Sequence, residues 1–186
     1  MGRSLIVQEL VSADGFVAET DGGLEFFGAV PDFGDIDAES IEDLRAVDTV
    51  LLGARTYRLF VDFWPTSEEI VAEAVNTTHK FVYSKSLQAA PWGSWKPATV
   101  VPGDAVEHVR ALKREPGGTI MVWGSISIAR ALFAAGLVDE LQLRVLPVVI
   151  GTGRTLFTAA TGRKVLTLRE SKQYASGVAA LRYGAA

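Results

Sequence analysis

Two glycines stand where an apolar, strand-like segment passes directly into a helix-like segment. The apolar segment TIMVW leads into Gly124-Ser125, and the apolar segment TVLL leads in the same way into Gly53. A helix that begins directly after a strand presents its unpaired N–H groups and its positive dipole end at the carboxyl edge of the sheet. Each junction therefore predicts a phosphate site. Two such junctions in one open sheet favour a dinucleotide bound across that edge.

The side chains at these junctions add donors and a charge that suit a phosphate. Arg55 carries a fixed cation with paired N–H donors, and Thr56 offers a hydroxyl. The alternative for Arg55 is a solvated surface position. Ser125 could contact a ligand or act as an ordinary helix cap that bonds the backbone of residue 127 or 128. Trp123 could stack on a bound cofactor or face the core.

The segments that position these junctions alternate between strand-like and helix-like patterns, which predicts an α/β fold with a largely parallel sheet. The predicted strands are Leu5–Val11, Thr49–Gly53, Lys80–Ser84, Thr99–Pro102, Thr119–Gly124 and Asp139–Ile150. The predicted helices are Ala38–Ala46, Thr56–Phe63, Glu68–Thr77, Ala105–Arg114 and Ser125–Ala135. Asp104 is the expected N-cap of the fourth helix, with Glu107 in capping-box position, and Gly136 is expected to end the fifth.

After Gly136 the pattern changes to strands alone. The segments Val165–Tyr174 and Val178–Tyr183 flank the turn residues 175–177, which predicts an antiparallel hairpin at one edge of the sheet. The chain shows neither a Gly/Pro/Ser-rich linker nor a repeat of fixed period. We therefore expect a single domain over residues 1–186.

The composition argues against several classes of partner. With 48% hydrophobic residues the chain can fill a real core, and its net charge of −4 leaves no basic stripe for nucleic acid. The longest apolar stretches, such as 145–150, have the length of a strand, so we expect no membrane span. The N-terminus lacks the features of a signal peptide, which favours a cytoplasmic protein.

The chain contains no cysteine and only two histidines, His79 and His108. This excludes disulfides, thiolate nucleophiles and cysteine-ligated zinc. No carboxylate cluster has metal-ligand spacing around either histidine, so we expect no metal site and no Ser-His-Asp chemistry. A solvated position is the simplest interpretation of both histidines, although His79, which precedes a strand, could instead face a ligand.

Taken in order, the motifs resemble those of the dihydrofolate reductase-like superfamily. They are most similar to stand-alone relatives of the reductase domain of bacterial riboflavin biosynthesis, the RibD C-terminal type. The motifs that carry this resemblance are Ser12-x-Asp14-Gly15, Leu51–Tyr57, Phe63–Pro65, Val82–Lys85, Val122–Ser125, Gly136–Leu141 and Pro147–Gly153. The resemblance implies a three-layer fold: a mostly parallel central sheet with helices on both faces and an antiparallel C-terminal hairpin.

The resemblance also implies an NADPH-dependent oxidoreductase. The cofactor-binding residues that it implies are Ser12, Gly53, Arg55, Thr56, Ser84, Lys85, Trp123, Gly124, Ser125, Gly151 and Gly153. Ser84 and Lys85 are expected at the adenosine 2′-phosphate. Ala54 stands where the superfamily usually has arginine, which weakens the expected preference for NADPH over NADH. Trp123 stands where the classical reductases have glycine.

The loop after the first strand is expected near the nicotinamide. Asp14 could hold this loop through an Asx-type hydrogen bond or reach an amine of the substrate. Gly151 and Gly153 could approach the cofactor or form a plain turn. Ser12 and Asp14 would both lie at this end of the site.

The reduction of a carbonyl or imine also needs a proton. Folate-reducing relatives supply it from an acidic residue of the first helix. By its spacing from Gly53, Asp37 falls nearest to that position, with Glu39 close behind, although Asp37 could equally be a helix cap. Asp37 and Asp14 are therefore the candidate catalytic residues.

The resemblance suggests a particular reaction, the reduction of 5-amino-6-(5-phosphoribosylamino)uracil. Without cysteine the zinc site of the partner deaminase cannot be built, so the chain would perform only the reductive half. The alternatives are a non-catalytic NADP(H)-binding module, or a dihydrofolate reductase-like enzyme that acts on another pterin or carbonyl. Because RibD-type relatives dimerise through their C-terminal half, we expect a homodimer.

Overall fold

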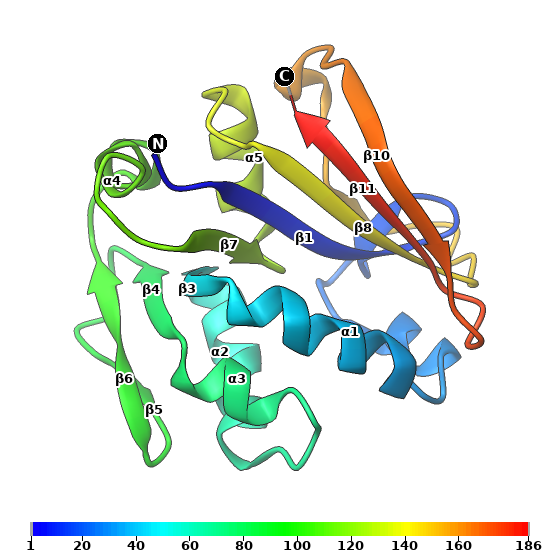
Figure 1. Ribbon diagram of the computed structural model, residues 1–186, viewed down its shortest axis with the longest axis horizontal. Coiled ribbons are helices and arrows are strands. Elements are labelled where there is room, and N and C mark those ends of the chain that lie inside the picture. Colours follow the sequence, from blue (N-terminus) through cyan, green and yellow to red (C-terminus); the bar gives the residue numbers. More distant parts are fainter. Residues whose placement is uncertain (1, 186) are drawn as a thin grey trace.

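A nine-stranded sheet runs through the computed structural model, which describes residues 2–185 (Figure 1). Its strand order is β10-β11-β8-β1-β7-β3-β4-β6-β5. The strands are β1 Leu5–Ser12, β3 Val47–Gly53, β4 His79–Tyr83, β5 Ala90–Trp92, β6 Trp95–Val101, β7 Thr119–Trp123, β8 Glu140–Leu146, β10 Leu166–Gln173 and β11 Ala179–Ala185. The six strands from β8 to β6 are parallel, which confirms the predicted sheet.

Helices cover both faces of this sheet, as the resemblance implied. The α-helices are α1 Gly34–Arg45, α2 Ala54–Phe63, α3 Ala72–Thr77, α4 Ala105–Leu112 and α5 Ile126–Ala134. The 3₁₀ helices are η1 Glu25–Ala29, η2 Trp64–Thr66 and η3 Ala159–Thr161. Figure 1 shows α4 and α5 on one side of the sheet and α1, α2 and α3 on the other.

The alternation of side chains along the strands builds the two cores. In β1, Leu5 and Val7 join a cluster with Leu132 of α5, whereas Ile6 packs into a second cluster with Leu44 of α1 and Val75 of α3. Successive residues of a strand point to opposite faces, so one strand supplies both layers. This explains why the central strands read as continuous apolar runs.

Several expected boundaries shift in the structure. The first predicted helix begins four residues earlier, at Gly34, and the helix predicted from Glu68 is reduced to α3. The strand predicted over Asp139–Ile150 ends at Leu146. Strand β5 and the small antiparallel pair of β2 Phe16–Ala18 with β9 Arg154–Thr155 were not predicted from the sequence. Segments of two or three residues are too short to show a periodic pattern.

The expected helix ends are found. The carboxylate of Asp104 accepts hydrogen bonds from the N–H groups of Val106 and Glu107, at 2.7 and 3.2 Å. The Glu107 side chain does not complete a capping box; it forms an ion pair with Arg110 at 2.7 Å. Gly136 follows α5 with φ +66°, a conformation that glycine adopts without strain.

The C-terminal hairpin closes one edge of the sheet, as predicted. Strand β11 pairs antiparallel with both β8 and β10, and Tyr174 N–H donates to the Val178 carbonyl at 2.9 Å across the turn. Strand β10 has no further neighbour within residues 2–185 and is exposed along almost its whole length. Among residues 2–185, no helix is long and apolar enough to cross a membrane.

Candidate functional site: a groove between two strand–helix junctions

Two crossing hydrogen bonds join the β3–α2 junction to the β7–α5 junction. The Gly53 N–H donates to the Ser125 hydroxyl at 2.8 Å, and the Thr56 hydroxyl donates to the Gly124 carbonyl at 2.9 Å. The second bond depends on Gly124, whose φ of +65° turns its carbonyl toward α2. We call this pair of hydrogen bonds the junction clasp.

The junction clasp leaves the N-termini of α2 and α5 without side-chain caps. Ser125 occupies the N-cap position of α5, but its hydroxyl is engaged by Gly53 and makes no cap bond. The cap bond to residue 127 or 128 considered above is therefore not formed. Gly53 is the N-cap of α2 and has no side chain to offer. Both first turns thus keep N–H donors available to a ligand.

A groove runs over these two helix ends. Its lining consists of Gly53, Ala54, Arg55, Thr56, Gly124, Ser125, Ile126, Ser127, Arg130, Gly153, Arg154 and Thr155. The N-terminal dipole ends of both helices meet there, so the groove favours negative charge.

Three arginines line the groove without any carboxylate partner. Arg130 donates to the carbonyls of Leu156 and Thr155 at 2.9 and 2.6 Å. Arg154 donates to the carbonyls of Thr20 and Asp21, and Arg55 donates to the same Asp21 carbonyl. None of the three forms an ion pair within residues 2–185. In a chain of net charge −4, the groove concentrates uncompensated positive charge.

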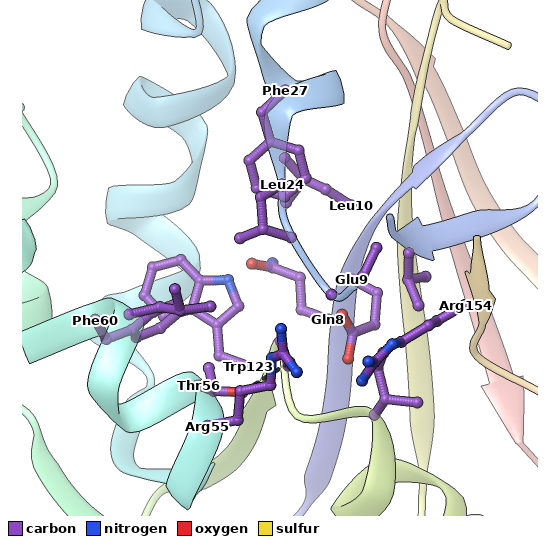
Figure 2. A pocket seen from close by; sticks show the side chains of 16 residues that line it. Gln8, Glu9, Leu10, Leu24, Phe27, Arg55, Thr56, Phe60, Trp123 and Arg154 are labelled. Carbon is purple, nitrogen blue, oxygen red and sulfur yellow. Dashed lines mark hydrogen bonds between the residues drawn. The ribbon is translucent and has the colours of Figure 1, made fainter. Parts of the chain in front are cut away.

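A more enclosed pocket continues from the groove and shares Arg55, Thr56, Gly124, Ile126 and Arg154 with it. Its other lining residues are largely apolar: Leu10, Val17, Ala18, Gly22, Leu24, Phe27, Leu59, Phe60 and Trp123, together with Gln8 and Glu9. In Figure 2, Leu24 and Phe27 lie on the upper side, Arg55 and Thr56 on the lower side, and Gln8 and Glu9 between them. We call this space the inner pocket.

Glu9 is the unusual member of this lining. It lies in the middle of β1, is 3% exposed, and its Oε1 atom has no hydrogen-bond partner within residues 2–185. Its burial raises the pKa of the carboxyl to about 8. Glu9 is therefore held mainly as the neutral acid at neutral pH.

The neighbouring Gln8 shows the opposite situation. It is equally buried, but its Nε2 donates to Gln142 Oε1 at 2.8 Å, and Gln142 in turn donates to Glu140 at 2.7 Å. Its amide nitrogen is thus bonded within the sheet. Of the two polar side chains that β1 contributes to the inner pocket, only Glu9 has a fully buried oxygen without a hydrogen-bond partner within residues 2–185.

Trp123 lies at the inner pocket but is already in aromatic contact. Its ring stacks on Trp64 with centroids 5.6 Å apart, and Phe60 meets it edge-on at 5.5 Å. This contact belongs to the helix layer of α2. Trp123 therefore packs against Phe60 and Trp64 and also lines the inner pocket.

Asp14 and Ser12 hold the loop after β1. The Ser12 hydroxyl donates to Asp14 at 2.6 Å, and the carboxylate also accepts the N–H groups of Gly151 at 2.7 Å and Ile150 at 3.3 Å. The Ser12 hydrogen bond is the main reason why the pKa of Asp14 is lowered. Neither Ser12 nor Asp14 lines the groove or the inner pocket. This arrangement favours the loop-holding interpretation of Asp14.

Other candidate residues are distributed unevenly. Gly153 lines the groove and comes so close to the Ala18 carbonyl that a Cβ atom would collide with it. Ser84 accepts the N–H groups of Ser86 and Leu87 at 3.2 and 3.1 Å, in a turn after β4. Lys85 is exposed beside it, and both lie outside the lining of the groove.

Asp37 lies in the first turn of α1, outside the lining of both the groove and the inner pocket. The N-cap of α1 is Phe33, so the capping interpretation of Asp37 is wrong. Partial burial, with Glu69 nearby, raises the pKa of its carboxyl to about 6.

Sequence reasoning missed Glu9, Arg130 and Arg154. A signal for Glu9 was present, because it is the one charged residue in a strand that is buried on both faces. Arg130 and Arg154 carried no such signal. They reach the groove only because α5 and β9 meet beside the two junctions.

The model of the RibD C-terminal domain family matches residues 3–180 of this chain. The uncharacterized protein YyaP of Bacillus subtilis is 28% identical over 186 residues, which cover 97% of this chain and 94% of YyaP.

Solved structures show the same fold. A Shewanella sp. PV-4 protein assigned provisionally to riboflavin biosynthesis superposes with a TM-score of 0.80 at 19% identity, covering 98% of this chain and 99% of that protein. The Thermotoga maritima diaminohydroxyphosphoribosylaminopyrimidine deaminase/5-amino-6-(5-phosphoribosylamino)uracil reductase gives 0.68 at 13% identity; all of this chain covers 57% of that one. Enterococcus faecalis dihydrofolate reductase, in complex with NADP(H), gives 0.61 at 12% identity, covering 98% and 96%.

The junction clasp makes a first prediction. The substitution Ser125→Ala leaves the Gly53 N–H without its acceptor, so we expect a loss of about 1–3 kcal/mol in the free energy of unfolding. Urea denaturation followed by circular dichroism measures this loss. Ser127→Ala is the matched control, because Ser127 is an exposed residue of the same helix end, and we expect it to stay within about 0.5 kcal/mol of the wild type. Equal stability of the two variants would contradict the clasp.

The buried Glu9 makes a second prediction about pH. Its pKa rises from 4.5 to about 8 on folding, so unfolding releases a proton between these values and stability falls as the pH rises. Glu9→Gln removes this dependence. We expect the stability of the variant relative to the wild type to increase by about 1.4 kcal/mol per pH unit across that window, as measured by urea denaturation. Parallel pH curves for the two proteins would refute a protonated Glu9.

Proposed function

This chain belongs to the RibD C-terminal domain family, and from that premise we propose that it is an NADPH-dependent reductase of a small polar heterocycle. The observation that carries the proposal is the groove, where two uncapped helix ends and three arginines without acidic partners converge. Such a groove suits the phosphates of a dinucleotide, which supports the proposal.

The residues of the groove fit the cofactor. The open N–H groups of α2 and α5 would hold its pyrophosphate, with Gly53 and Gly124 allowing close approach of the backbone. Arg55, Arg130 and Arg154 would neutralise its charge, because guanidinium groups that now donate to carbonyls gain a stronger acceptor in a phosphate.

The inner pocket would receive the reacting end. When bound, a reduced nicotinamide supplies a hydride. The apolar side chains of Leu24, Phe27 and Phe60 would exclude water from this space and orient a flat ring. The continuity of the groove and the inner pocket supports one extended ligand that reaches from the arginines to Glu9.

Residues outside the groove would distinguish NADPH from NADH. Lys85 follows β4, the strand next to β3, and is free of ion pairs within residues 2–185. We propose that Lys85, with Ser84, contacts the 2′-phosphate. Ala54 stands where the superfamily usually has an arginine, so the preference for NADPH would depend more heavily on Lys85.

For the substrate we propose 5-amino-6-(5-phosphoribosylamino)uracil. The family and the fold shared with the Thermotoga maritima bifunctional enzyme support this choice. One observation favours a second candidate, another pterin or carbonyl compound. Apart from Arg55 and Arg154, the described residues that line the inner pocket are without positive charge, which suits a ring that carries no phosphate.

Cofactor binding is the direct test of the proposed function. NADPH is titrated into the protein while tryptophan is excited and nicotinamide emission is followed, since Trp123 lines the inner pocket. We expect saturable energy transfer, weaker with NADH. Arg55→Gln should weaken NADPH binding by about 10- to 150-fold, because a charge-assisted hydrogen bond contributes about 1.5–3 kcal/mol.

The matched control is Arg58→Gln. Arg58 is an exposed residue of the same helix that lies outside the groove, so we expect an unchanged dissociation constant. Absence of energy transfer, together with a silent calorimetric titration, would refute the reductase. Equal weakening by both substitutions would refute the role of the groove.

We also propose a homodimer that covers strand β10. Leu168 of this edge strand is 52% exposed and Val165, directly before the strand, is 78% exposed. An uncovered edge of this kind invites pairing with another chain. Leu168→Lys should shift the protein from dimer to monomer in sedimentation velocity. The control is Ile70→Lys. Ile70 is an apolar residue that is 61% exposed and lies outside the C-terminal hairpin, so this variant should leave the dimer intact. A monomeric wild type would overturn this proposal.

A further inference from the structure

We infer that Glu9 is the proton donor of the inner pocket, an inference that rests on the reductase function proposed above. It would give its carboxyl proton to the oxygen or nitrogen of the substrate bond that is reduced. Glu9 lies outside both strand–helix junctions, in the middle of β1.

The position of Glu9 carries the inference. It shares a face of β1 with Val7 and Val11, which lie in the apolar cluster that also contains Val17, and it lines the inner pocket beside Ile126. Its Oε1 atom is buried and without a partner within residues 2–185. A buried polar atom without a partner is costly, so an aliphatic side chain would stabilise the fold better at this position. A ligand that bonds Oε1 would remove that cost.

The neighbouring arginines do not stabilise the charged form of this carboxyl through an ion pair. Arg55, from α2, and Arg154, from β9, line the same pocket, and Arg130 of α5 lines the adjoining groove. All three donate to backbone carbonyls, and none forms an ion pair with Glu9. Burial is the cause of its raised pKa. Glu9 thus keeps its proton in the pocket where the reducing equivalent would arrive.

Hydride transfer to carbon breaks the π bond of a C=O or C=N group in the substrate, and the nicotinamide is oxidised. The electron pair of that bond moves onto oxygen or nitrogen, where it forms an O–H or N–H bond with the proton of Glu9. Glu9 is left as a carboxylate and regains a proton from water before the next turnover.

The other candidate acids are less well placed. Asp14 accepts three hydrogen bonds and has a lowered pKa, so it holds no proton to give at neutral pH. Asp37 has a raised pKa, but it lies outside the inner pocket. Glu9 alone among the three combines a retained proton with a position in the lining.

The first measurement follows the carboxyl itself and needs no substrate. Protein labelled with ¹³C at the glutamate carboxyl carbons is titrated by NMR, as wild type and as Glu9→Gln. We expect one resonance with a midpoint of about 8 that is absent from the variant. If every glutamate titrates in the ordinary range, Glu9 is not the proton donor.

The second measurement is single-turnover oxidation of saturating NADPH with 5-amino-6-(5-phosphoribosylamino)uracil. We expect the wild-type rate to fall above about pH 8, and Glu9→Gln to lower the rate at least about 100-fold and to remove this pH dependence. NADPH affinity, read from tryptophan energy transfer, should stay within about twofold of the wild type, as expected when only transition-state stabilisation is lost. Glu115→Gln, an exposed glutamate, is the control and should keep the wild-type rate.

The outcomes separate the two proposals. A wild-type protein that binds NADPH but reduces neither this compound nor a pterin or carbonyl panel overturns the proposed function, and the inference falls with it. A working reductase whose Glu9→Gln variant keeps the wild-type rate or pH profile overturns the inference alone. Loss of the pH dependence in Asp37→Asn but not in Glu9→Gln would also overturn it and assign the role to Asp37.

Discussion

The junction clasp is the constraint on which the rest of the site depends. A helix N-terminus usually satisfies part of its backbone through the side chain of its own N-cap. Here each hydroxyl forms a hydrogen bond with the opposite junction instead: Ser125 with Gly53, and Thr56 with Gly124. The same two bonds therefore hold the N-termini of α2 and α5, which cover opposite faces of the sheet, together at its carboxyl edge and leave their N–H groups open. Stability of the sheet edge and readiness for an anion come from one arrangement.

The arginines of the groove follow the same logic. A guanidinium group that pairs with a carboxylate is already neutralised, whereas one that donates to a carbonyl is oriented and keeps its full charge. Arg55 and Arg154 share the Asp21 carbonyl, and Arg130 spans two carbonyls before η3. The backbone thus orients three uncompensated cations, so the proposed anionic ligand would require little reorientation of their side chains.

The sequence revealed the parallel sheet, the two junctions and the C-terminal hairpin because each leaves a local pattern. Apolar strands ending in glycine, helical periodicity and turn residues are all visible within a few positions. The groove cations Arg130 and Arg154 were not visible, since they lie outside the junction motifs and converge only through tertiary packing. Asp37 was chosen by spacing along the chain. Spacing places a residue on a helix but does not say which cavity that part of the helix reaches.

Glu9 and Asp14 show how one strand and its following loop give two carboxyls opposite chemistry. Asp14 lies exposed at the sheet edge, where Ser12, Ile150 and Gly151 donate to it, and these bonds favour the charged form. Glu9 lies five residues earlier, inside an apolar cluster that favours the neutral form. Environment, rather than residue type, decides which acid keeps its proton. An aliphatic side chain at residue 9 would stabilise the fold better than a buried acid without a full set of partners, and this cost supports the role proposed for Glu9.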